Sequence, residues 1–431
     1  MFGCLLCGER GLADFALNVL LFVPLGAALA WAGERGRTAL GAGALLSLGI
    51  EVAQLAIPGR DSSLSDVVSN TIGSLVGWLA VTHGPRVVAL PSRTAALLTA
   101  AAAALPSLVV AATGALFRPD FPHAQYYGGW TPDFGHMARY RGRVLSARVA
   151  GVPILEGALP NSDTVRALLR AGTALELRVV VGPRVSRLAP LLSINDDAQR
   201  EILLLGADRD DLVLRWRMRA AAWRLDQPEV RVAGAFAGRR NGDTIALAVH
   251  RSRDGYCIAV EGGARTCGLN FGPGRGWSLL RHAAGGGRGW AQLADATWLA
   301  ALFAPLGWCA CSRRGVWGGA ALLLALGVAP PLARLLPAGV AEWAGGAAGL
   351  LLGTAGRARC RPRARPRLAR EWLRPHGAQQ PVETAIDARV ALVKGGLGLP
   401  DRIGDRPRRD GAGIEVAQHD ERTAVPPAQF T

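Results

Sequence analysis

Long apolar stretches near both ends of this chain predict membrane-spanning helices. A helix needs about 20 mostly apolar residues to cross a bilayer. Seven stretches come close to that length, at residues 14–32, 38–57, 66–83, 87–113, 290–311, 316–336 and 338–354. We therefore expect a polytopic α-helical membrane protein with about seven spans.

The polar block between the fourth and fifth stretches, residues 116–288, has a different pattern. Apolar and polar residues alternate in short runs, with Gly, Pro and Asp between them. The clearest runs are ALELRVVVG, REILLLG, DLVLRWRMR, EVRVAGAF, TIALAVHR and YCIAVEGG. Short strands at this spacing are typical of a β-sandwich, and the block is long enough to bury a core of its own. We expect an inserted all-β domain.

Composition agrees with a membrane protein and adds a basic tail. Half of the residues are hydrophobic (50%), and the net charge is +16 at pH 7. Residues 355–431 begin with RARCRPRARPRLAR and continue rich in Pro, Gly and charge, which predicts a disordered tail whose basic start lies on anionic lipid headgroups. We expect no nucleic-acid partner, because the arginines cluster at the ends of predicted spans and not in a patch with interleaved aromatic residues.

The two apolar regions repeat one another. LFVPLG returns as LFAPLG, LLSLGI as LLALGV, and SDVVSNTIGSLVG as AEWAGGAAGLLLG, at offsets of 281, 278 and 276 residues. This predicts a duplicated three-helix unit, with a first copy within residues 1–113 and a degenerate second copy within 290–354. Chance similarity between Leu-, Gly- and Ala-rich helices is the alternative. Gly73 and Gly77 form a Gly-x3-Gly pair, which predicts close helix contact.

Arginines in the short loops predict the orientation in the membrane. Basic residues near helix ends favour the cytoplasmic side. Such residues follow the first span, flank the start of the fourth, join the fifth to the sixth and follow the seventh. All four places can be cytoplasmic at once, which puts the central block and the loop 58–65 outside. Alternatively, the fourth stretch, broken by Pro91 and Pro106, is two interfacial pieces, and the central block then lies on the other side.

Two cysteines test this orientation. Cys257 and Cys267 lie in two alternating runs joined by the turn EGG, the pattern of a β-hairpin. We predict a disulfide between them, which fits an oxidising compartment outside the cytoplasm. Two reduced cysteines are the alternative. Cys4 and Cys7 form a single CxxC, which supplies too few ligands for a structural zinc site.

Polar residues recur inside the first three stretches, where polar side chains are costly. In order they form N-VLLFVPLG, IEVAQ and R-DSSLSDVVSNTIGSLVG. This series resembles the VanZ-like family of bacterial membrane proteins, whose founding member is tied to resistance to the glycopeptide teicoplanin without a settled chemistry. The resemblance implies a multi-pass protein of the bacterial cytoplasmic (inner) membrane.

Six polar residues of these motifs form the candidate site. Glu51 and Asp66 are the candidate catalytic residues, as a general base or as cation ligands. The candidate substrate-binding residues are Asn18, Gln54, Arg60 and Asn70. Arg60 could grip a phosphate or carboxylate of an envelope lipid. The alternative is structural, with hydrogen bonds between helices and an ordinary ion pair of Arg60 in its loop.

The second copy lacks most of this polarity. Glu51 corresponds to Ala329 and Asn70 to Gly346, while Asp66 corresponds to Glu342. We therefore place any chemistry in the first copy and expect Glu342 to be dispensable.

The central block resembles concanavalin A-like (laminin G-like) jelly rolls, in the order PLLSINDDAQREILLLGADRDDLVLRWR and then GDTIALAVHRSRDGYCIAVEGG. Domains of that kind bind carbohydrate or protein, and some are glycanases, but the glycanase pattern E-x-D-x-x-E is absent from this sequence. We expect no cofactor. Calcium could bind oxygen ligands in the acidic turns, although turn positions explain these residues without it: Asn195, Asp196, Asp197, Asp208, Asp210 and Asp211. Five aromatic residues could stack on sugars, although core packing is the commoner role: Tyr126, Tyr127, Trp130, Trp216 and Trp223.

Two functions of different classes follow. In the first, an external sandwich binds a glycan or a protein while the VanZ-like bundle handles or shields a lipid-linked component, which affects glycopeptide sensitivity. In the second, a membrane enzyme acts on such a lipid through Glu51 and Asp66. A transporter is a weaker third. The expected partners are membrane lipids and an envelope glycan or lipid-linked precursor.

Overall fold

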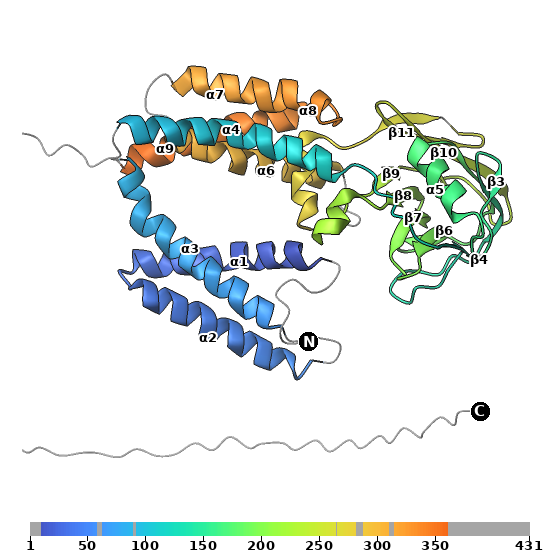
Figure 1. Ribbon diagram of the computed structural model, residues 1–431, viewed down its shortest axis with the longest axis horizontal. Helices are drawn as coiled ribbons and strands as arrows, with labels where there is room; N and C mark the ends of the chain where they lie inside the picture. The colour runs from blue at the N-terminus through green and yellow to red at the C-terminus, as the bar shows by residue number, and fades with distance from the viewer. Residues whose placement is uncertain are drawn as a thin grey trace, which may run out of the picture. The chain divides into compact units, whose positions relative to one another are not determined.

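Three helices near the N-terminus form the first unit of the fold. The computed structural model describes residues 10–57, 63–88, 92–263, 265–281, 288–309 and 314–360. The unit contains α1 (Gly11–Trp31), α2 (Gly36–Gln54) and α3 (Leu64–Val88). Both α1 and α2 pack against α3 (Figure 1).

A second helical unit combines α4, which precedes the central domain, with the helices that follow that domain. Helix α4 (Ser92–Leu116) packs along α6 (Arg288–Cys309), and α6 packs closely on α9 (Val340–Cys360). Along the chain, α6 is followed by α7 (Arg314–Leu322), a π-helical segment η3 (Leu323–Val328) and the short α8 (Ala329–Leu332), and then by α9. Two prolines lie in the first turn of α8, where their missing N–H groups would have no partner within that helix. Helix α9 runs six residues into the segment predicted as a disordered tail, and the rest of that segment lies outside the described residues.

Glycines bring the helices of both units together through matching contacts. A Cβ on Gly73 would overlap the carbonyl oxygen of Val19, and a Cβ on Gly349 would overlap that of Ala300. The two glycines are 276 residues apart and their partners 281 apart, which are offsets of the sequence repeat. Two further contacts recur in the same way, Gly26–Ser74 as Gly307–Leu350 and Gly77–Val23 as Gly353–Ala304. The repeat therefore extends from the sequence to the helix packing.

Three helices in the described part of the chain are long and apolar enough to cross a membrane. They are α1, residues 64–84 of α3 and residues 93–116 of α4. In the described residues the other predicted spans also contain helices, but α2, α6 and α9 are not among these three, and the apolar helical part of 316–332 is shorter. The count of seven spans therefore stays a prediction.

The central domain consists of two six-stranded antiparallel sheets. The first has the order β4-β1-β6-β7-β8-β9 and the second β12-β11-β10-β5-β2-β3. The strands of the first sheet are β1 (Tyr126–Trp130), β4 (Gly157–Ala158), β6 (Ala189–Asp196), β7 (Glu201–Asp208), β8 (Asp211–Trp216) and β9 (Val230–Val232). Those of the second are β2 (Arg143–Val149), β3 (Val152–Pro153), β5 (Leu175–Val180), β10 (Thr244–Ser252), β11 (Gly255–Val260) and β12 (Thr266–Leu269).

Both sheets contribute to one hydrophobic core, so the domain is sandwich-like. Leu192 and Leu205 of the first sheet and Leu177 and Leu247 of the second belong to the same buried cluster. All six predicted strand runs form strands. The jelly-roll connection of the strands stays a prediction.

One helix of this domain was not predicted. Helix α5 (Ser162–Ala171) buries Val165 and Leu169, which are four residues apart on one face. Gly172 ends it in the left-handed conformation, with φ at +78°. An apolar pair at helical spacing followed by Gly is the signal that marks this helix in the sequence.

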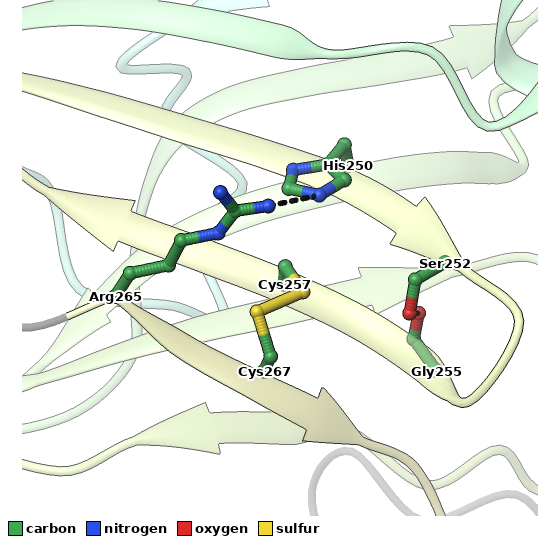
Figure 2. Close-up of a disulfide and its surroundings, with 6 residues drawn as sticks. All are labelled: His250, Ser252, Gly255, Cys257, Arg265 and Cys267. Atoms are coloured by element: carbon green, nitrogen blue, oxygen red, sulfur yellow. Dashed lines mark hydrogen bonds between the residues drawn. A yellow bond between two sulfur atoms is a disulfide. The ribbon is translucent and has the colours of Figure 1, made fainter.

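The predicted disulfide joins β11 to β12 through Cys257 and Cys267 (Figure 2). Strand β12 is the edge of its sheet and pairs only with β11 among the described strands. Beside the disulfide, an Arg265 guanidinium nitrogen donates to His250 Nε2 at 2.7 Å (Figure 2). The bond therefore fixes a short edge strand covalently to its neighbour.

Candidate functional site

Three of the candidate residues meet where α1, α2 and α3 come together. Asn18 Nδ2 donates to Asp66 Oδ1 at 2.8 Å, and the side chains of Asp66 and Glu51 are hydrogen-bonded to each other. Glu51 is buried, and its Oε2 accepts the backbone N–H of Ser63 at 2.8 Å. Two neighbouring carboxylates repel one another, so this pair suits acid–base chemistry or the binding of a positive group.

Asn70 lies one turn further along α3 and is also buried. Its Nδ2 donates to Ser47 Oγ of α2 at 2.8 Å, whereas its Oδ1 has no hydrogen-bond partner among the described residues. The Ser74 hydroxyl, another turn along, is buried in the same way. Burying a polar atom without a hydrogen-bond partner is costly. The Asn70 Oδ1 and the Ser74 hydroxyl can therefore each form a further hydrogen bond inside the helix bundle.

The two remaining candidates are not brought into this cluster. Gln54 is the last residue of α2, is half-buried, and forms no side-chain hydrogen bond with the residues that the structure describes. Arg60 lies outside the described residues, as does most of the predicted loop 58–65.

The equivalent helices of the second unit pack together with apolar residues at most of the matching positions. The offsets of the repeat pair Asn18 with Leu299, Ser47 with Ala325, Glu51 with Ala329, Asn70 with Gly346 and Ser74 with Leu350. Leu299 and Ala325 are fully buried in the hydrophobic core of the second unit. Polar side chains at these positions are therefore not required for this kind of helix packing.

One acidic pair persists in both units. Asp14 and Asp66 of the first unit correspond to Asp295 and Glu342 of the second, and the members of each pair interact electrostatically. The correspondence of Asp14 with Asp295 was not predicted, although the offset of 281 residues indicates it. The second unit therefore has two acidic groups at the matching positions, Asp295 and Glu342, whereas only Glu342 was predicted.

A segment of the chain itself satisfies the second pair. The 3-10 helix η2 (Pro273–Leu279) follows β12, and its Gly274 N–H donates to Glu342 Oε1 at 2.6 Å. Trp277 Nε1 donates to Asp295 Oδ1 at 2.6 Å, and the Arg275 guanidinium lies 3.5 Å from the same oxygen. At this place in the three-helix unit, the acidic pair thus binds N–H donors and a guanidinium.

The acidic turn residues of the sandwich are engaged with arginines and backbone. Asp196 accepts the backbone N–H and the Nε–H of Arg200 at 2.9 and 2.8 Å. Asp208 lies 2.7 Å from Arg231. Burial lowers the pKa of Arg231, but the Glu229 and Asp208 carboxylates outweigh it and raise this pKa above its usual value. In the described ranges, no three His, Cys, Asp or Glu side chains come together as a metal ion would require.

The aromatic candidates divide between core and surface. Tyr126 and Trp216 are buried in the sandwich core, and Trp130 packs against it. Burial raises the pKa of Tyr126 to about 12, so its hydroxyl remains a donor to the Pro122 carbonyl at 2.8 Å. Trp223 is different, because its side chain is 64% exposed and so available to a ligand or a lipid surface.

A comparison with protein families bears on the first unit. Residues 5–84 match the model of the VanZ/LLP1 family. The VanZ-like segment spans α1, α2 and most of α3, and it contains Asn18, Glu51 and Asp66. No curated protein and no solved structure matches the chain. A VanZ-like segment together with three membrane-length helices indicates a membrane protein related to the cell envelope.

Proposed function

We propose that this protein binds an envelope component at the polar cluster of its VanZ-like unit, from the outer side of the bacterial inner membrane. The sandwich then lies outside as a module that binds glycan or protein. A lipid-linked precursor is the expected occupant of the cluster, and its binding affects teicoplanin sensitivity.

A binding role is supported by the second unit, which has apolar residues at positions that match the polar cluster of the first unit. There the same helix contacts form with Leu299, Ala325 and Gly346 in place of Asn18, Ser47 and Asn70. Bundle packing therefore explains the glycines but not the polar side chains. Ionisable residues within membrane helices are expensive and mark functional sites by default.

The second unit also suggests what chemistry the cluster accepts. Its acidic pair is filled by an amide N–H, an indole N–H and a guanidinium of η2. In the first unit, the Arg10 guanidinium lies 3.8 Å from Asp14, and the Asn18 side-chain amide donates a hydrogen bond to Asp66. By analogy, an amine- or amide-bearing group, such as the peptide part of a cell-wall precursor, is the fitting ligand.

Co-purification of lipids tests this function. We expect mass spectrometry of the purified full chain to detect a lipid-linked envelope component that is lost from Glu51→Gln and Asp66→Asn. Glu34→Gln, which removes an exposed carboxylate from the loop between α1 and α2, is the matched control and should retain it. Equal retention by all three variants contradicts the proposal.

The hydrogen-bonded carboxyl pair favours a second function, a membrane enzyme acting on such a lipid. Glu51 and Asp66 would then exchange a proton with the substrate during the reaction. Incubation of membranes with the co-purified lipid separates the two functions. An enzyme converts it to a new species in the wild type but not in Glu51→Gln, whereas a binding protein leaves it unchanged in both.

A further inference from the structure

A cavity of about 850 Å³ lies where the end of α4 meets the sandwich. Phe117, just beyond α4, lines it and belongs to the same hydrophobic core as both sheets. The backbone also joins these parts, because the Asp120 N–H donates to the Arg217 carbonyl and the Arg219 N–H to the Arg118 carbonyl, both at 2.9 Å. The cavity is thus built into the junction between a membrane-length helix and the sandwich.

Six arginines from separate parts of the chain line this cavity. They are Arg118, Arg170, Arg219, Arg251, Arg253 and Arg334. Its described lining contains no acidic side chain, and none of the six forms an ion pair with a carboxylate of the described residues. An arginine in a protein stays protonated. Several positive charges therefore face one space without a neutralising partner in the described part of the chain.

Hydrogen bonds fix the side chain of one of these arginines and the backbone of another. Arg251 donates to the Arg170 carbonyl and also hydrogen-bonds the Tyr256 hydroxyl. Burial raises the pKa of Tyr256, so this hydroxyl stays protonated. Arg334 has a left-handed backbone, with φ at +61°, and Asn270 Nδ2 donates to its carbonyl at 2.9 Å. A left-handed residue after the C-cap is a common way to end a helix, so this backbone fixes where the chain leaves α8 beside the cavity.

The interior of the cavity is aromatic. The rings of Trp216 and Tyr256 are 4.2 Å apart, and both line the cavity with Phe117 and Phe121. On α4, two turns before the cavity, Leu108 is 65% exposed, as a lipid-facing side chain would be. The cavity therefore combines a cationic rim, an apolar floor and a position next to the end of a membrane-length helix.

We propose that this cavity binds the phosphate group of an anionic membrane lipid. Guanidinium groups bind phosphate oxygens through paired, charge-assisted hydrogen bonds. The aromatic floor accommodates the glycerol and the first part of the acyl chains, which a free phosphate lacks. The site is separate from the acidic cluster of the VanZ-like unit and does not depend on the function of that cluster.

Calorimetric titration of the full chain in neutral detergent tests the assignment. The probes are a short-chain phosphatidic acid, the matching short-chain phosphatidylcholine and inorganic phosphate. We expect saturable binding of phosphatidic acid, with the other two at least about tenfold weaker, because each loses either the net charge or the apolar contacts. Inorganic phosphate as tight as the lipid would overturn the lipid assignment in favour of a soluble phosphate.

A pair of triple variants tests the arginines. Arg118→Gln, Arg219→Gln and Arg253→Gln together remove three exposed charges from the rim. We expect them to weaken phosphatidic acid binding by about tenfold or more, since charge-assisted hydrogen bonds are lost. If this variant aggregates, Arg253→Gln alone, in the turn after β10, replaces it.

The matched control changes the same charge elsewhere on the sandwich. Arg139→Gln, Arg141→Gln and Arg143→Gln together remove three exposed arginines that do not line the cavity. Binding should then be unchanged. An equal loss in both triple variants would mean that net charge alone attracts the lipid, and no loss in either would mean that it binds elsewhere; both outcomes overturn the proposal.

Discussion

Glycine hydrogens, not side chains, face the partner helix where α1 crosses α3 and where α6 crosses α9. These positions leave no room for a methyl group, so the helix backbones lie in direct contact. Packing of this kind is a common way to hold membrane helices together, because small residues permit close approach. The residues that fix the helix spacing are thus distinct from the polar residues that we assign to binding.

Gly73→Ala should destabilise the first unit. The new methyl group would overlap the Val19 carbonyl, which is backbone and cannot move aside cheaply. Overpacking costs about 1–3 kcal/mol. Gly41→Ala is the control, because nothing lies within 4 Å of its added Cβ, and alanine is the better helix former by about 0.5–1 kcal/mol. Thermal unfolding of both variants in detergent, followed by helical circular dichroism, checks the opposite signs.

Glu342→Gln should lower stability, contrary to the expectation from sequence that this residue is dispensable. Its two carboxylate oxygens accept the Gly274 and Gly339 N–H groups at 2.6 and 2.7 Å. A glutamine must turn its NH₂ group toward one of these donors, which costs about 1–3 kcal/mol for the buried group left unpaired. The same unfolding measurement checks this, with exposed Glu34→Gln as control. A melting point equal to wild type would contradict it.

Among the elements, the sequence pattern located the long helices of both helical units and the six clearest strands of the sandwich, but not helix α5. Within the described residues, each of the seven apolar stretches contains a helix and each of the six alternating runs contains a strand, because burial of one face or one stripe sets these patterns. The sequence did not predict the π-helical turn η3, whose letters LLALGV match regular α-helix in the first unit. Two prolines, Pro330 and Pro331, follow it and lack the N–H groups that would bond regularly to the preceding turn.

The candidate site was predictable only in part. Spacing placed Glu51 and Asp66 on helix faces, and the structure pairs them. No sequence pattern indicated that η2 would supply donors to Asp295 and Glu342. These contacts join η2 to α6 and α9, which are separate elements of the chain. The basic cavity was missed for a similar reason, since its arginines come from separate elements that meet only after folding.

Loss of the hairpin disulfide should weaken the sandwich. Cys257 and Cys267 are 10 residues apart, and closing a loop of that size stabilises the fold by about 2–3 kcal/mol in the chain-entropy model. We expect Cys257→Ser with Cys267→Ser to lower the unfolding temperature of the sandwich, while Cys309→Ser, at a cysteine of α6 that is not part of this bond, leaves the sandwich transition unchanged. Peptide mapping without reductant should recover the linked pair from the wild type. Free thiols at both positions would contradict the bond.

At the scale of the whole molecule, the orientation in the membrane decides which sites meet the envelope. The arginine loops and the disulfide favour an external sandwich. Alkaline phosphatase fused after Gly286 should therefore be active, and the same enzyme fused after Arg314 should be inactive. High activity at Arg314 and none at Gly286 would invert the orientation and place both proposed sites toward the cytoplasm.

Because η2 follows the disulfide-bonded strand β12 in the chain, the parts of this protein are expected to assemble in a set order. Gly274, which supplies a donor to buried Glu342, comes seven residues after Cys267. Chains emerge from the ribosome N-terminus first, so the VanZ-like unit can insert and pack before the sandwich exists. The last helices bind a segment that follows the sandwich in the chain, and these contacts form only after that segment has been made. A cell impaired in oxidative folding of its envelope would therefore show the fault in this protein as late, incomplete assembly of its C-terminal membrane helices.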